Sequence, residues 1–177
     1  MEKHKFTMGR PRNFVLLIAA MIVLGAGAAW AATTTVTATL KFLTDLTVTT
    51  NNGPNFGYVK AATVGTYVLS TAGVLTPSGG GVSEGGVPAA GSYTIKGSGT
   101  QLINISDGNY VAVGASTPTA GTCKYGGAAS GTCNQAGLAA PGAGGTTLLV
   151  GLTVTTSAAG ADNQTDTPHF DLTIVYQ

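Results

Sequence analysis

The sequence has 177 residues, and only 8% of them are charged, with eight Lys and Arg against seven Asp and Glu. Four of the basic residues lie in the first twelve positions, so the rest of the chain has four scattered lysines and no arginine. Nucleic-acid and polyanion binding need a clustered basic surface, and this composition excludes one.

Residues 1–31 have the organisation of a secretory signal peptide. The apolar run 14–27 follows four basic residues and precedes the small-residue site Ala29-Trp30-Ala31. We predict cleavage after Ala31, export through the periplasm to the cell surface, and no membrane insertion of the mature chain. The alternative is a retained anchor helix, which the run is slightly too short to form, because about 20 apolar residues are needed to span a bilayer.

The first segment after this site, Thr33–Leu43, alternates apolar and polar side chains. Its apolar positions are Val36, Ala38, Leu40 and Phe42. Period-two alternation rich in Thr is typical of a half-buried strand. A strand at a free N-terminus can pair within its own domain or with a neighbouring copy, and the sequence leaves both possibilities open.

Several short extended segments and one loop are expected next. Asn51–Pro54 is a turn signal, and the Gly-rich tract 77–91 predicts a loop without regular structure. The expected extended segments are Leu46–Thr49, Phe56–Tyr58, Gly65–Ser70 with Tyr67 and Leu69 inward, and Ser92–Lys96 with Tyr93 and Ile95 inward.

A β-hairpin is predicted over residues 102–113. Two apolar runs flank Asp107-Gly108, and Asp-Gly favours a two-residue type I′ turn because both central residues need positive φ.

Residues 114–145 are rich in Gly, Ala, Ser and Pro and predict a long loop. The loop contains both cysteines, Cys123 and Cys133. In an exported protein a pair so close in sequence predicts a local structural disulfide.

Two long strands are expected at the end of the chain, joined by a polar loop. Thr146–Thr155 places four aliphatic side chains on one face, and His169–Gln177 does the same with Phe170, Leu172, Ile174 and Tyr176. No segment after residue 31 has helical periodicity. We therefore predict a single all-β domain over residues 32–177, an Ig-like antiparallel β-sandwich of about seven to nine strands.

Enzymatic chemistry finds little support in the sequence. His169 is the only histidine after residue 31, and its neighbours Thr167 and Asp171 share its strand face, which favours a solvated pair over a catalytic base. Asp162, Asn163 and Asp166 lack the twelve-residue pattern of a calcium loop. We predict no catalytic residue, no metal site and no cofactor, and keep a hydrolase only as a residual alternative.

Several segments, taken together, resemble a bacterial family of exported pilin-like sandwiches of unknown function, similar in appearance to spore-coat-U-like proteins. The resemblance spans nearly the whole chain after residue 31, and the order of its motifs carries it. The matching pieces are the Thr/Ala/Val strand after the signal, Asn55-Phe56-Gly57-Tyr58-Val59, Gly65–Ser70, Tyr93–Gly97, Leu149–Val154 and the final strand ending in Tyr176-Gln177. It implies an exported structural or surface protein, and the similarity to pilins implies assembly by donor-strand exchange.

The leading hypothesis is a non-enzymatic subunit of a surface filament or coat. One copy would donate Val36, Ala38, Leu40 and Phe42 to a groove in the next, giving a head-to-tail homopolymer, with an export chaperone as a further candidate partner. The alternative is a monomeric adhesion or binding module that completes its own sandwich and binds a ligand through its loops.

Overall fold

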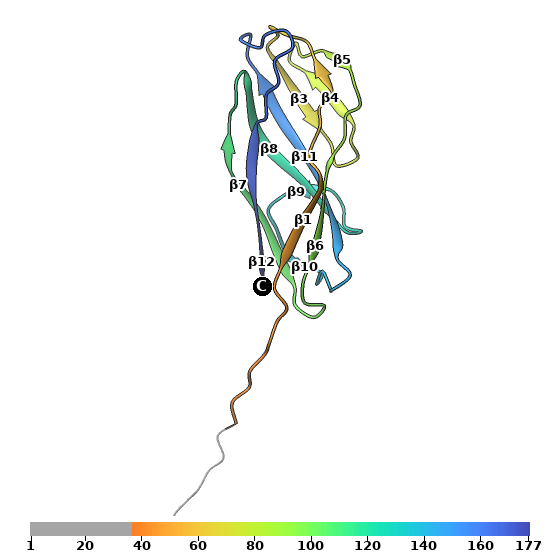
Figure 1. The fold of residues 1–177 in the computed structure, drawn as a ribbon, viewed down its shortest axis with the longest axis vertical. Coiled ribbons are helices and arrows are strands. Elements are labelled where there is room, and N and C mark those ends of the chain that lie inside the picture. Colours follow the sequence, from red (N-terminus) through yellow and green to blue (C-terminus); the bar gives the residue numbers. More distant parts are fainter. Residues whose placement is uncertain (1–36) are drawn as a thin grey trace, which may run out of the picture. The chain divides into compact units, whose positions relative to one another are not determined.

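The computed structural model describes residues 37–177, so the predicted signal peptide and Val36 lie outside the described residues. The chain divides into Met1–Leu40 and Lys41–Gln177. The second unit, called the body below, contains the strands described here (Figure 1).

The body is built from antiparallel strands, and residues 37–177 contain no helix. The predicted all-β class is therefore confirmed. Twelve strands are present, more than expected, because short strands form in segments predicted to be loops. They are β1 (Thr47–Asn52), β2 (Tyr58–Val59), β3 (Gly65–Leu69), β4 (Leu75–Ser78), β5 (Ser83–Gly85), β6 (Gly91–Lys96), β7 (Ile103–Val111), β8 (Ser116–Tyr125), β9 (Gly131–Thr132), β10 (Gln135–Leu138), β11 (Thr146–Thr156) and β12 (His169–Tyr176).

Strand β11 is the centre of a seven-stranded sheet. It pairs with β8 along one edge, and along the other edge first with β6 and then with β3. The path β1-β6-β11-β3-β4 runs across this sheet, and β9 adds to β8. A second sheet has the order β10-β7-β12, and β2 pairs with β5 in a small third sheet.

The hydrophobic core lies between the two larger sheets, which makes the body a β-sandwich. Ile95, Leu148 and Val150 come from the larger sheet, while Ile103 and Ile105 come from β7 in the smaller one, and all are fully buried. The aliphatic face predicted for Thr146–Thr155 is thus confirmed, because period two sends every second side chain of β11 inward.

The predicted hairpin over residues 102–113 is wrong. Strand β7 continues through Asp107-Gly108 and pairs with β12, which comes from the far end of the chain. The register slips where Gly108 to Val111 oppose Asp171 to His169, and Asn109 has φ 49°. Residues 108–111 therefore form a β-bulge in β7. The strand continues past Asp107-Gly108 because the long strand β12 pairs with it, and Asn109 tolerates positive φ.

The two predicted glycine-rich loops also contain strands. Residues 77–91 include β5 and the end of β4, and residues 114–145 include β8, β9 and β10. The small side chains of β8 reflect close packing: a Cβ on Gly121 would lie 3.0 Å from Asp107 Oδ2 and 3.1 Å from Cys133 Sγ. Sequence periodicity did not detect this strand, because its buried positions before Tyr125 are Pro118, Gly121 and Cys123, which are small and not evenly spaced.

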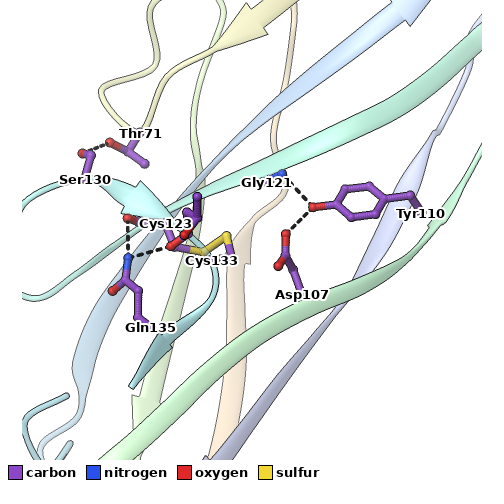
Figure 2. The surroundings of a disulfide bond; sticks show 9 residues. Thr71, Asp107, Tyr110, Gly121, Cys123, Ser130, Cys133 and Gln135 are labelled. Carbon is purple, nitrogen blue, oxygen red and sulfur yellow. Dashed lines mark hydrogen bonds between the residues drawn. A yellow bond between two sulfur atoms is a disulfide. The ribbon is translucent and has the colours of Figure 1, made fainter. Parts of the chain in front are cut away.

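The predicted disulfide between Cys123 and Cys133 is confirmed. Their Cα atoms lie 4.7 Å apart and both side chains are fully buried. The bond links β8 to the residue after β9, and Gln135 Nε2 donates hydrogen bonds to the carbonyl oxygens of Cys123 and Thr132 beside it (Figure 2).

Candidate assembly site

The N-terminal segment expected to be a strand is not one in this single chain. Residues 37–46 carry no strand, and every side chain from 37 to 45 is exposed. Ala38 is among them, and Leu40 and Phe42 are 75% and 86% exposed. A strand needs a ladder partner for its backbone groups, and residues 37–46 have none within the described chain. The segment thus presents large apolar side chains to water.

The start of the body is fixed where this segment joins it. The Tyr176 hydroxyl donates a hydrogen bond to the Thr44 carbonyl oxygen and accepts one of 2.6 Å from the Ser98 N–H. Leu46 packs against the core, and Lys41 Nζ donates to Gln101 Oε1 at 2.6 Å. The N-terminal connection is therefore anchored at the end of the body where β12 ends, which we call the exit end.

Strands β1 and β12 each have a free edge. Among residues 37–177, β1 pairs only with β6, and β12 pairs only with β7. They belong to different sheets, and Figure 1 shows both running along the body to the exit end. An edge strand offers a row of unpaired N–H and C=O groups to any further strand.

A groove of about 560 Å³ lies between these two edges. Val48 and Thr50 of β1 form one wall, and Tyr93 and Leu152 are also among its lining residues. The other wall consists of the consecutive residues 169–174 of β12. Consecutive residues alternate between the two faces of a strand, so the backbone edge of β12 is itself part of the groove.

The inward side chains of β12 are only half buried. Phe170, Leu172 and Ile174 alternate with exposed residues, as the sequence predicted, yet none reaches the burial of the aliphatic residues on β11. Their apolar surface faces the groove, so a further apolar strand placed there would complete the core.

Phe170 is held in position by a hydrogen-bonded tyrosine. Its ring stacks on Tyr110 with centroids 5.2 Å apart, and Figure 2 shows the Tyr110 hydroxyl between Asp107 and the Gly121 N–H. Burial, and then the hydrogen bond to Asp107, raise the pKa of Tyr110, so the hydroxyl stays protonated at neutral pH. This contact joins β7 to β8 across the sandwich and fixes one wall of the groove.

The groove continues into a wider hollow of about 960 Å³ at the end opposite the exit end. Pro54, Leu152 and Pro168 line both spaces. The hollow is bounded mainly by residues 54–63 and 156–168, and we call it the far hollow.

Asp166 is a structural acceptor in the far hollow. Its carboxylate accepts hydrogen bonds from Gln164 Nε2 at 2.7 Å and from the Ala115 N–H and the Ser116 hydroxyl at 2.9 Å. These bonds, the one from Gln164 foremost, lower the pKa of Asp166. The residue ties the loop 157–168 to the start of β8.

The residues considered for catalysis and metal binding are not brought together. His169 Nδ1 lies 3.3 Å from the Thr167 carbonyl oxygen, and Asp171 accepts a hydrogen bond from Asn109. Asp162 contacts Asn163, while Asp166 has the partners named above. Within residues 37–177 no group of three or more His, Cys, Asp or Glu is placed to hold a metal ion.

Comparisons with protein-family models, with curated proteins and with solved structures find no match for this chain. In the part of the chain that the structure describes, no helix is long and apolar enough to cross a membrane.

The acceptor side of the site was missed by sequence reasoning. The alternation in Leu46–Thr49 and His169–Gln177 identified both strands, but whether a strand lies at an edge depends on which distant segments pair with it. The local signal for β1 was its composition, which is polar except for Val48, and the structure leaves all six of its residues exposed.

Proposed function

We propose that this protein is a non-enzymatic, exported structural subunit that assembles head to tail, with residues 33–43 of one copy filling the groove between β1 and β12 of the next. The observation that carries the proposal is the coexistence, in one chain, of an apolar groove between two free edges and an unpaired, exposed segment with alternating apolar side chains. The free edges of the groove offer backbone partners to the segment. The apolar side chains of the segment would in turn cover the apolar lining of the groove.

The dimensions of the two parts agree. At roughly 3.3 Å per residue, the alternating run from Val36 to Phe42 spans about 23 Å, close to the length of an eight-residue strand such as β12. Its apolar side chains would face the inward side chains of β12, and its threonines would face solvent.

The anchoring of the chain at the exit end favours exchange between copies. A segment that paired beside β1 of its own body would need a turn immediately before β1. Thr44 is tied to Tyr176 there and Leu46 is packed into the core, so both residues are already held in other contacts. A segment from another copy meets no such obstacle.

The direction of the incoming strand decides what kind of assembly results. If it runs antiparallel to β12, the donating copy lies beyond the far hollow, and its exit end meets the opposite end of the acceptor. Such a heterologous contact stays open and grows into a fibre, whereas a parallel strand would bring two exit ends together and allow a closed pair. We propose the arrangement antiparallel to β12, in which the ladder with β12 is slightly more stable per residue than a parallel one. The same strand would run parallel to β1, because β1 begins at the exit end where β12 ends.

The proposal is tested by SDS gel migration of the secreted protein with and without boiling. We expect a ladder of multimers that collapses to a monomer band on boiling. A variant lacking residues 32–43 should give no ladder. Leu40→Asp should also abolish it, because a carboxylate would enter the apolar groove, while the matched control Thr39→Asp on the opposite face should retain it.

A monomer band in the unboiled protein would contradict the proposal. Together with loss of folding in the variant lacking residues 32–43, it would support the alternative, a monomeric module that completes its own sandwich. A ladder that survives Leu40→Asp would show that multimers form through another surface.

A further inference from the structure

The far hollow has features that the groove lacks. It is wider, and it lies where the groove opens away from the exit end. Its described lining has unbalanced charges, with Glu84, Asp162 and Asp166 against one cation, Lys60. It also contains an aromatic side chain in water, since Tyr58 is 70% exposed.

We infer that the last residues of the donated segment, Lys41–Leu43, lie where the groove opens into the far hollow, so that Phe42 is the last side chain in the groove and the far hollow forms the contact between successive subunits. The inference rests on the proposed function and adds the surface on which one body meets the next. It assigns the far hollow, into which the groove opens, to the contact with the donor's body.

The position of these three residues follows from where the chain is anchored. Thr44 is bonded to Tyr176 at the exit end of the donor, so Leu43, Phe42 and Lys41 are the first residues to leave the donor's body. With the donated strand antiparallel to β12, they cross the start of β12 in the acceptor, which is the border of the far hollow. A shift of the donated strand along β12 does not change this order, because Thr44, which is anchored to the donor, always follows the inserted residues in the chain.

The chemistry of the two surfaces is complementary. Lys41 is the only charged residue of the donated segment, and it would approach a surface that holds Glu84 and Asp162. Phe42 is the most exposed large apolar side chain near the junction, at 86%, and would cover the exposed ring of Tyr58. Neither side chain has an apolar or anionic partner of this kind in its own described body: Lys41 is bonded to the neutral Gln101.

The test is a pair of introduced cysteines, Phe42→Cys with Asn163→Cys, in the full-length secreted protein. Asn163 is an exposed residue of the far hollow, and both native cysteines are bonded to each other and buried, which leaves only the introduced thiols to react. A multimer longer than a dimer needs bonds between the two different introduced positions or at both of them, so the ladder and not a dimer band is the signal. After mild oxidation we expect a ladder that survives boiling without reductant and collapses when reductant is added. The matched control, Phe42→Cys with Thr100→Cys, places the second thiol on the exposed loop that follows Ser98 at the exit end and should give no covalent ladder.

The other outcomes separate the two proposals. A heat-sensitive ladder without covalent multimers would overturn the inference about the far hollow and leave strand exchange intact. A covalent dimer in the Thr100→Cys control would place two exit ends together and overturn the inference in favour of a closed pair. Absence of any multimer, covalent or heat-sensitive, in both variants and in the unmodified protein would overturn the proposed function and this inference together.

Discussion

Asp166 shows how a single side chain closes one end of the sandwich. Its carboxylate gathers the Ala115 N–H, the Ser116 hydroxyl and the Gln164 amide, groups that belong to two separate stretches of chain. Hydrogen bonds to the charged form favour that form, which is why they lower the pKa of Asp166 in the folded state.

The lowered pKa predicts a dependence of stability on pH. In the unfolded chain the carboxyl titrates near pH 4, and in the folded chain it titrates lower, so its contribution is fully present above pH 4 and is lost as the pH falls through the folded value. We expect Asp166→Asn to lower the thermal midpoint at pH 7 and to reduce the loss that the protein suffers between pH 5 and pH 2. Thermal unfolding followed by circular dichroism at several pH values measures both effects.

Asp162→Asn is the matched control, because Asp162 lies in the same loop and contacts only the neighbouring Asn163 among the hydrogen bonds of the described residues. It should leave the pH profile unchanged. Equal profiles for the protein and Asp166→Asn would mean that the three hydrogen bonds contribute nothing to stability.

At the scale of elements, the disulfide holds the segment that follows β9 against β8. Its neighbour β9 is two residues long, so Cys133 is held against β8 chiefly by the bond to Cys123 and by Gln135. Closing a loop of this length contributes about 2 to 3 kcal/mol in the chain-entropy model. We expect the double variant Cys123→Ala, Cys133→Ala to lose about that free energy of unfolding, measured by urea denaturation.

Reductant provides the internal control for this prediction. It should shift the urea midpoint of the protein toward that of the double variant and have no effect on the variant itself. A double variant with the midpoint of the oxidised protein would show that the bond is not needed to hold β9 and Cys133 in place.

The sequence predicted the strands whose side chains alternate in polarity. It did not predict the features that depend on which distant strands pair with each other. β3, β6, β11 and β12 carry large apolar residues at every second position, and each was found close to its observed bounds. β8 was missed because its buried positions before Tyr125 are Pro118, Gly121 and Cys123, and a register shift breaks their period-two spacing. Asp107-Gly108 was assigned to a turn because a local rule could not know that β12 would pair across it. The disulfide followed from residue spacing and the predicted compartment, but the groove required the strand order.

At the scale of the whole molecule, the proposed assembly assigns the donor and acceptor roles to different parts of the chain. Leu40 and Phe42 are exposed, while Phe170, Leu172 and Ile174 line an open groove in the body. Exposing both apolar surfaces in one copy is costly in water, and the proposed joining of copies would remove that cost at every step of growth. A subunit without its own N-terminal segment should therefore remain a competent acceptor.

This separation predicts that a free peptide can replace the donor. The variant lacking residues 32–43 should bind a synthetic peptide with the sequence of residues 33–43 and be stabilised by it. A ligand that binds only the folded state at one hundred times its Kd adds about 2.7 kcal/mol, enough to raise the Tm by several degrees. A peptide carrying Leu40→Asp and Phe42→Asp retains the length and the threonines but not the apolar face, so it should give no shift. Equal shifts with both peptides would mean that binding does not use the apolar groove, and no shift with either would mean that β1 and β12 do not form an acceptor.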